Sequence, residues 1–387
     1  MRYNIGMYEG GAFSPFVRLR QRQSKAGKGP GLADRFLAGK RRIKGEEKET
    51  LSRKGLHSVM ADLVAENVYR LCVPIPFPLR TVNVYVLVGP AGWALFDTAI
   101  GTEEARTLIY EELQGLGLKL EELRAIVLSH MHPDHVGLSG ELYERSRAAV
   151  YMHPIDEAAL QLFWNSAQAR TFAQTNQFFV PHGMPREPLY PPQVPREVMR
   201  KVVGVPAHEA FTLLEDGQQL ELLGERYEVL WTPGHADGHI CLYRPRDGVF
   251  LAADHVLPRI TPNVGLYSAQ ARENPLGDFL SSLRKVENLP ASIVLPGHGE
   301  PFADLALRVR ELIEHHDQRE QEIFALLAQH PQHAYQLAKQ LFSARLKSQD
   351  AWRMAVAETL SHLEYMRYAG QVRQQHTSDG LILYAAL

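Results

Sequence analysis

The sequence predicts an α/β or α+β sandwich, with sheets in the middle and helices outside, followed by a small helical domain. Strand-like apolar stretches alternate with helical ones in a first block after residue 68 and again in a second block after residue 211. From about residue 303 the apolar residues recur at helical spacing. Strands with interspersed helices in two successive blocks are typical of layered folds with central sheets.

Alternating apolar residues and turn signals define the elements of the first block. Residues 68–73 alternate like a strand, and the turn at 89–92 separates two further apolar runs. Thr102 can cap a helix, and Glu103 and Glu104 suit the positive helix end. The predicted strands are 68–73, 82–88, 93–97 and 125–129, and the predicted helices are 102–114, one from Ser139, and 155–177.

The second block follows an irregular, proline-rich stretch from 181 to 195. Its first three strands are closely spaced, which favours an antiparallel series. The predicted strands are 211–214, 219–223, 227–232, 240–243 and 249–253, and a helix at 275–288 leads to a last strand at 293–295.

After residue 303 the pattern predicts three helices and a hairpin, which is a winged-helix pattern. The second and third helices cover 333–342 and 352–368, Gly370 ends the third, and the hairpin turns at 377–380. Winged helices often bind nucleic acid by placing a helix in the major groove. The basic patch at 346–353 is only modest, so a packing or homo-oligomer role is favoured over a nucleic-acid partner.

The first 58 residues differ in charge from the rest of the chain. They contain 14 Lys and Arg against 5 Asp and Glu, near +9, which leaves the remainder near −11. They are glycine-rich and show no sustained period, so we expect this segment to be flexible. A basic arm or a transit peptide has no supporting motif, and Met60 is an alternative start. The expected domains are a basic, disordered or non-native extension at 1–59, a catalytic domain at 60–302 and a C-terminal domain at 303–387.

The composition is that of an ordinary soluble protein. The chain has 387 residues, of which 45% are hydrophobic and 22% are charged. It contains no run of the roughly 20 apolar residues that a membrane-spanning helix needs, so no membrane partner is expected. Cys72 and Cys241 are too few for a disulfide framework and are expected as small buried hydrophobes. A reducing cytoplasmic location fits this cysteine usage best.

A cluster of metal-ligand side chains follows the predicted strand at 125–129. His130, His132, Asp134 and His135 lie within six residues. A loop that leaves a strand can fold several imidazoles toward one point, and imidazole and carboxylate ligands suit zinc, and also iron or manganese. The cluster therefore predicts a metal site.

Three distant residues of the same kind also follow apolar strands. His235 and His298 each come directly after a Pro-Gly pair, and Asp254 follows the strand at 249–253. The glycines permit tight turns that point each imidazole back toward a shared cleft. His255, beside Asp254, is expected to be structural or to line the pocket.

Together these residues resemble the signature of the metallo-β-lactamase superfamily, a His-x-His-x-Asp-His loop followed by a distant His, Asp and His. Asp97 matches the aspartate at the end of an early strand in that family. The resemblance implies an α/β fold of the αββα sandwich type, and the C-terminal pattern resembles the branch with a terminal winged helix. It also implies two divalent metal ions, most simply zinc. The first would be held by His130, His132 and His235 and the second by Asp134, His135 and His298, with Asp254 bridging them and Asp97 orienting a ligand imidazole.

The implied chemistry is hydrolysis by a hydroxide held between the two metal ions. The candidates to protonate the leaving group are a metal-bound water and a nearby aspartate, Asp134. A secreted antibiotic-hydrolysing enzyme would carry an export signal and, in one large group, a cysteine where Asp254 stands, so that activity is not expected. The oxygen-reducing di-iron relatives have a glutamate at the position of His132, which argues against redox chemistry.

Three functions stay open at this point. Thioester hydrolases of the glyoxalase II type, lactonases and metal-dependent ribonucleases share all seven ligands. The acidic balance after residue 58 favours a small ester-like substrate, a thioester or lactone, over a polyanion. A single-strand-specific ribonuclease is the alternative, and a nucleic-acid-binding module with a structural metal is the third, although structural zinc sites normally have four ligands.

The segment 155–210 is expected to cover the cleft and to select the substrate. Tyr267 is a further candidate to reach the pocket. The aromatic residues of the segment that could serve core, pocket or both are Phe163, Trp164, Phe172, Phe178 and Phe179.

Overall fold

The computed structural model describes residues 61–165, 177–186, 196–269, 271–342, 346 and 348–387. The predicted N-terminal extension at 1–59 lies outside the described residues, as does Phe172. None of the described helices is long and apolar enough to cross a membrane.

Within these residues the first sheet has seven strands in chain order, and its topology is mixed. The strands β1 to β4 pair antiparallel, whereas β4 to β7 pair parallel. The strands are β1 (Asp62–Ala65), β2 (Val68–Pro74), β3 (Thr81–Gly89), β4 (Gly92–Phe96), β5 (Leu123–Val127), β6 (Ala149–Met152) and β7 (Phe211–Leu213).

The predicted pairing of the strand at 211–214 is wrong. It was expected in an antiparallel series with 219–223 and 227–232, but β7 pairs parallel with β6, with Val150 opposite Phe211. The short spacing between 211–214 and 219–223 favours pairing of these two strands. The strand β7 instead pairs with β6, which the sequence pattern does not reveal. The short strand β1 was also missed.

The second sheet has five described strands in the order β12-β11-β10-β9-β8. The strands β8 to β11 form the predicted antiparallel series, and β12 pairs parallel with β11. The strands are β8 (Gln219–Leu222), β9 (Glu225–Trp231), β10 (Ile240–Arg244), β11 (Val249–Ala253) and β12 (Ile293–Pro296).

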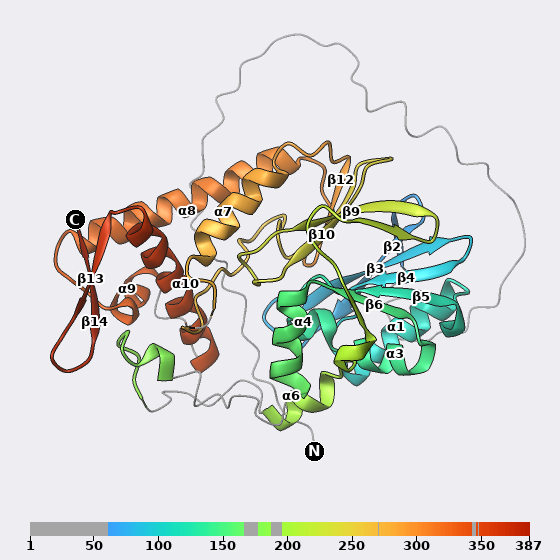
Figure 1. The fold of residues 1–387 in the computed structure, drawn as a ribbon, viewed down its shortest axis with the longest axis horizontal. Coiled ribbons are helices and arrows are strands. Elements are labelled where there is room, and N and C mark those ends of the chain that lie inside the picture. Colours follow the sequence, from blue (N-terminus) through green and yellow to red (C-terminus); the bar gives the residue numbers. More distant parts are fainter. Residues whose placement is uncertain (1–60, 166–176, 187–195, 270, 343–345, 347) are drawn as a thin grey trace, which may run out of the picture. The chain divides into compact units, whose positions relative to one another are not determined.

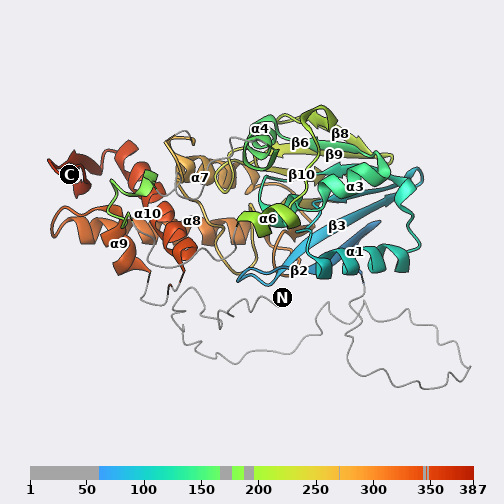
Figure 2. The same cartoon turned by 90° about the horizontal axis from the view of Figure 1, so that it is seen from below.

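The two sheets pack face to face and helices cover their outer faces, so the predicted α/β layering is confirmed (Figures 1 and 2). Apolar residues of both sheets form the central core. The helices α1 (Glu103–Gly115) and α3 (Ser139–Ser146) pack on the first sheet. The helix α7 (Pro275–Val286) and the first half of α8 (Leu305–Leu327) pack on the second.

Local signals explain where several helices begin. Thr102 caps α1, with its hydroxyl accepting a hydrogen bond from the Ala105 backbone N–H at 3.2 Å. Asn274 caps α7 in the same way, and Pro275 occupies the first helical position, where no N–H is needed. The shorter elements are α2 (Pro133–Val136), α4 (Pro154–Leu160), α6 (Arg196–Val202), the 3₁₀ turns Leu120–Glu122 and His208–Ala210, and a π-helical turn at Gln161–Asn165.

The C-terminal region contains the predicted helices and hairpin around a core of its own. Its elements after α8 are α9 (Ala334–Leu341), α10 (Gln349–Tyr368), β13 (Val372–His376) and β14 (Ile382–Ala386). Val309 and Leu312 of α8 belong to the layer on the second sheet, whereas Ile323 and Leu327 belong to the C-terminal core. This helix therefore joins the two cores. The winged-helix assignment and the domain boundary at 302 stay predictions.

The predicted covering segment is described only in part. The helix expected at 155–177 is α4 followed by the π-helical turn, and the rest of it lies outside the described residues. Phe163 is 39% exposed, and Trp164 packs against the core on the first sheet. Phe178 and Phe179 instead pack in the C-terminal core.

Candidate metal centre

The loop after β5 turns at once into the short helix α2, and this turn collects the first four ligand-type residues. His132 is the N-cap of α2, and Pro133 starts the helix with its fixed φ. Asp134 and His135 follow in the first turn and are buried. Because one helical turn follows directly on an extended residue, side chains that would alternate along a strand can face a common point.

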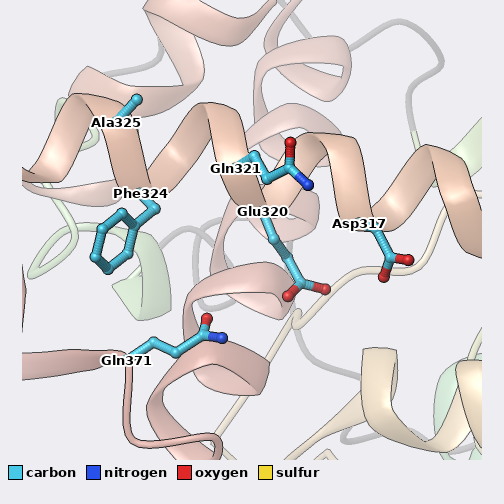
Figure 3. A pocket seen from close by; sticks show the side chains of 6 residues that line it. All are labelled: Asp317, Glu320, Gln321, Phe324, Ala325 and Gln371. Carbon is cyan, nitrogen blue, oxygen red and sulfur yellow. The ribbon is translucent and has the colours of Figure 1, made fainter.

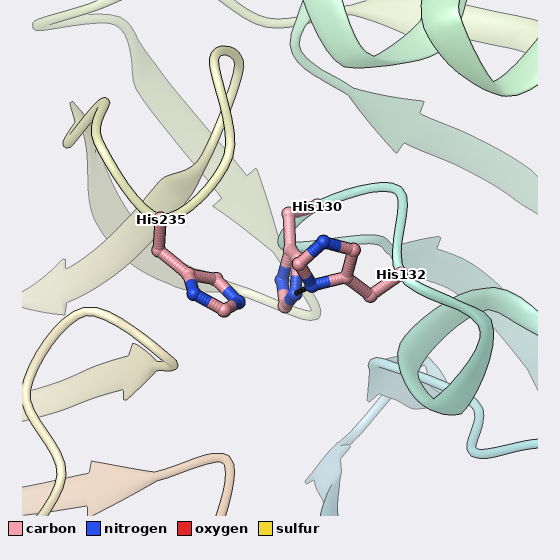
Figure 4. A group of neighbouring side chains, drawn as sticks. All are labelled: His130, His132 and His235. Carbon is pink, nitrogen blue, oxygen red and sulfur yellow. Dashed lines mark hydrogen bonds between the residues drawn. The ribbon is translucent and has the colours of Figure 1, made fainter. Parts of the chain in front are cut away.

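Two distant loops and the end of β11 bring the remaining residues to the same place. His235 follows β9, and Figure 4 shows its ring directed toward those of His130 and His132. The ligand atoms form three groups within 4.8 Å of one another, namely His130-His132-His235, His130-His135-Asp254 and Asp134-His135-His298. All seven predicted ligand residues are therefore brought together.

Asp254 lies at the centre of the cluster. Its Oδ1 is 3.5 Å from His135 Nε2, and its Oδ2 is 3.5 Å from His235 Nε2 and 3.4 Å from His298 Nε2. It therefore contacts imidazoles of both proposed metal sites. Gly297 permits this approach, because a Cβ at that position would lie 2.1 Å from Asp254 Oδ1.

Three of the imidazoles have their outer nitrogen held by an oxygen acceptor. Nδ1 of His135 lies 2.7 Å from Asp97 Oδ2, Nδ1 of His235 lies 2.8 Å from the Asn263 carbonyl, and Nδ1 of His298 lies 2.6 Å from the Thr81 carbonyl. A carbonyl or carboxylate can only accept here, so Nδ1 carries a proton, and Nε2 is the nitrogen that faces the cluster.

These inward atoms fit a metal ion. Among the described residues, Nε2 of His135, Nε2 of His235 and Oδ1 of Asp254 are buried and make no hydrogen bond. Buried polar atoms without partners are costly, and two divalent cations in the cluster would satisfy these three. The donor set of imidazoles and carboxylates is also one that zinc, iron or manganese accepts.

Burial and neighbouring charges shift the pKa values of two imidazoles of the cluster in opposite directions. Burial and the neighbouring His235 lower the pKa of His132 to about 3. Burial also acts to lower the pKa of His298, but Asp254 and Asp134 outweigh it and raise that pKa to about 10. A proton held on His298 by the two carboxylates would have to leave before a cation binds, so metal binding and proton release are coupled.

Asp97 supports the loop as well as His135. Its Oδ1 accepts the Ser129 backbone N–H and its Oδ2 accepts the Ser129 hydroxyl, both at 2.8 Å. The residue has a positive φ of 64°, which is uncommon without glycine, and it is only 1% exposed. Asp97 therefore orients the start of the ligand loop and one imidazole together.

The loop that carries His298 is held from the first sheet. The Asn83 amide donates to the Pro296 and Gly299 carbonyls at 2.8 and 2.7 Å, and the Tyr85 hydroxyl donates to the Pro296 carbonyl at 2.7 Å. Both donors come from β3, so residues of one sheet position a ligand loop of the other.

Sequence reasoning missed Asp156, which joins two ligand loops. Its Oδ2 accepts the Met131 N–H at 2.9 Å, and its Oδ1 accepts the Gly238 N–H at 2.6 Å. The residue is 1% exposed. The only signal in the sequence was an acidic residue early in a helix, which is also the usual position of a solvated carboxylate.

Two further histidines lie beside the cluster. The sequence patterns did not single out His239, which is fully buried. The centre of its ring lies 5.0 Å from the centre of the His130 ring, and its Nδ1 lies 2.8 Å from the Thr232 hydroxyl. His255 is fully buried between His239 and Phe279. Neither occurs in the three groups of ligand atoms.

A hollow of about 570 Å³ is lined by residues outside the cluster (Figure 3). Its lining comes from α8 and from Gln371, which precedes β13, and contains the carboxylates of Asp317 and Glu320 beside Phe324. None of the seven ligand-type residues lines it, so this hollow is separate from the metal cluster.

Several known proteins are similar to this chain. A metallo-β-lactamase family protein of known structure from Thermus thermophilus is 41% identical, with a TM-score of 0.73 over 84% of this chain and 100% of that one. A probable metallo-hydrolase of Bacillus subtilis is 28% identical over 79% of this chain and 93% of its own length. A shorter match, 28% identical over 29% of this chain and 33% of the relative, is an atrochrysone carboxyl ACP thioesterase of Aspergillus fumigatus.

Family models match both parts of the chain. The model described as "Metallo-beta-lactamase superfamily" matches residues 78–298, and that described as "Metallo-beta-lactamase-like, C-terminal domain" matches 321–387. The first match covers most of both sheets and all seven ligand-type residues. The chain belongs to the metallo-β-lactamase superfamily of metallo-hydrolases, and it carries that family's β-lactamase-like C-terminal domain.

Proposed function

We propose that the protein hydrolyses a small ester-like substrate, a thioester or a lactone, at a centre of two divalent metal ions. The observation that carries the proposal is the sharing of Asp254 between two sets of imidazoles, of which Nε2 of His135 and Nε2 of His235 make no hydrogen bond. His130, His132 and His235 would hold one ion and Asp134, His135 and His298 the other, with zinc the simplest choice for both.

Two divalent ions bound at such a site would lower the pKa of water toward about 7 and would polarise the oxygen of an electrophile. The protein residues supply orientation and proton transfer. Burial acts to raise the pKa of Asp134, but His135 and His298 outweigh it and lower that pKa below its usual value. Asp134 is thus a carboxylate at neutral pH, so it can accept a proton from the attacking water and pass it to the leaving group.

The charge of the chain and one relative support the substrate class. The chain after residue 58 carries a net charge near −11, which disfavours a polyanionic substrate. The distant Aspergillus relative is named as an acyl-carrier-protein thioesterase, and ester-like carbonyls are electrophiles of the required kind. We place the enzyme in a reducing cytoplasm, in keeping with two free cysteines, Cys72 and Cys241.

A single-strand ribonuclease is the second candidate. Three helices followed by a hairpin support it, because such a region can present a helix to nucleic acid. A non-enzymatic nucleic-acid module with a structural metal is disfavoured, since structural zinc sites use four ligands and seven converge here.

The test measures metal content and hydrolysis on the full chain. We expect about two metal equivalents per chain and turnover of a panel of thioesters, lactones and phosphodiesters. In Asp134→Ala and His235→Ala, turnover should be lost and the metal content should fall below two equivalents. His208→Ala is the matched control, since this exposed histidine pairs with Glu157 outside the cluster. Full turnover in the two ligand variants would disprove the proposal, and cleavage of labelled RNA without ester hydrolysis would favour the ribonuclease.

A further inference from the structure

The segment from 257 to 267 connects the metal cluster to the C-terminal helices. It begins three residues after Asp254 and ends before α7. The Arg308 guanidinium of α8 donates to the Leu257 carbonyl at 2.7 Å and to the Ile260 carbonyl at 2.9 Å. The start of the segment is thereby attached to the helix that joins the two cores.

Asn263 is the point where this segment contacts a ligand residue. Its backbone carbonyl accepts the Nδ1 proton of His235 at 2.8 Å. Its side-chain amide donates to Oε2 of Glu358 at 3.4 Å, and its side-chain oxygen accepts the hydroxyl of Tyr267. Both polar ends of the Asn263 side chain are therefore occupied, which restricts the rotation of the residue that holds His235.

The backbone around Asn263 is attached to α10 as well. The Leu266 N–H donates to the Ala357 carbonyl at 3.0 Å, although Ala357 lies within a helix. Gly265 allows this approach, since a Cβ there would lie 3.0 Å from the Ala357 Cβ and 2.6 Å from the Tyr267 ring. The register between the segment and α10 is thus set by two neighbouring residues, Ala357 and Glu358.

Packing in the C-terminal core does not explain why a carboxyl side chain, and not an apolar one, occupies position 358. The preceding Ala357 and the nearby Val356 and Leu360 are buried apolar residues of the C-terminal core. Burial raises the pKa of Glu358 to about 7, so the carboxyl costs stability where an apolar side chain would not. Its partner in the segment is the Asn263 amide.

We propose that Glu358 is a positioning residue of the metal centre, through which α10 fixes Asn263 and Asn263 fixes the ring of His235. The inference rests on the proposed function, because it takes His235 to be a metal ligand. The C-terminal region would then contribute to metal binding through the Glu358 side chain and through the backbone contact between Ala357 and Leu266.

The experiment titrates the metal-free full chain with cobalt(II) or zinc against a competing chelator. It compares Glu358→Ala and Glu358→Gln with Glu364→Ala as control, because Glu364 is a buried carboxylate of the same helix whose partner is Arg367. We expect Glu358→Ala to weaken one of the two equivalents by about tenfold to a hundredfold and to change the cobalt absorption spectrum. The weakened equivalent should be the one lost in His235→Ala.

Two conservative variants separate positioning from folding. Glu358→Gln keeps an oxygen that accepts from the Asn263 amide, so it should restore nearly normal affinity. Tyr267→Phe keeps the ring in the core and removes only its hydroxyl bond to Asn263, so it should weaken the same equivalent by about threefold to tenfold. The control Glu364→Ala should retain both affinities even if its melting temperature falls.

The failures of the two proposals are distinguishable. A wild-type chain that binds no metal would overturn both. A wild-type chain that binds two equivalents, with normal affinities and an unchanged cobalt spectrum in both Glu358→Ala and Tyr267→Phe, would overturn only the role of Glu358.

Discussion

At the scale of single residues, the cluster depends on polar side chains that hold the ligand loops from outside. Asp97, Asn83 and Asp156 each make two or more hydrogen bonds to loops that carry ligand-type residues. They are buried, so their loss leaves backbone groups without partners as well as loosening the loops.

We therefore predict that Asp156→Ala destabilises the protein by about 2 kcal/mol or more, because the Met131 and Gly238 N–H groups lose their buried acceptor. Chemical denaturation of the metal-free chain measures this. The same variant should bind metal more weakly, since the two ligand loops are no longer joined. Unchanged stability together with unchanged metal content would contradict the proposed link.

Gly297 offers a second test at this scale. Its replacement by alanine should reduce metal content and activity, because the new Cβ would meet Asp254 Oδ1 at 2.1 Å. Gly115→Ala is the control: nothing lies within 4 Å of a Cβ at the end of α1, so this variant should keep full metal content. If both variants behave alike, the steric argument for Gly297 is wrong.

At the scale of elements, α8 and α10 connect the C-terminal region to the second sheet and its loops. The helix α8 belongs to two cores, and α10 reaches the segment after Asp254 through Ala357 and Glu358. The half-buried carboxyl of Glu358 on α10 also makes stability depend on pH.

The pKa of Glu358 rises on folding from about 4.5 to about 7, with burial as the main cause. The folded chain keeps this proton when the unfolded chain has lost it, so the contribution to stability is full below pH 4.5 and is lost as the pH rises to about 7. The loss is at most roughly 3 kcal/mol. Glu358→Gln should therefore gain stability relative to wild type as the pH rises from about 5 to about 8 in urea denaturation. A constant difference across this range would contradict the prediction.

At the scale of the whole molecule, the cluster exists only where the two sheets meet. The first sheet supplies the loop after β5 and the donors of β3, and the second supplies the loops after β9, β11 and β12. Ligand-type residues from both sheets would be bound to the same ions, so metal binding should stabilise the sandwich as a unit.

Removal of metal should consequently lower the melting temperature. A ligand present at about a hundred times its dissociation constant stabilises the folded state by about 2.7 kcal/mol per site, which corresponds to several degrees. Calorimetry with and without chelator measures the difference, and excess zinc should reverse it. Identical melting curves would show that no resident metal stabilises the fold.

Much of this architecture could be predicted from local sequence signals. Thr102 caps α1 as expected, and the three C-terminal helices and their hairpin occur at the predicted places, because caps, turns and periodicity act within a few residues. The pairing of β7 with β6 was predicted wrongly, and Asp156, His239 and the contact of Glu358 with Asn263 were not foreseen.

The sequence by itself determined which residues could bind a metal, because imidazole and carboxylate groups after apolar strands are recognisable one motif at a time. Only the tertiary structure decided which side chains hold these groups in place. Asp156 and Glu358 look like ordinary helical carboxylates along the chain, and their partners lie far away in sequence. Long-range hydrogen bonds of this kind leave no periodic trace, since they depend on how whole elements pack.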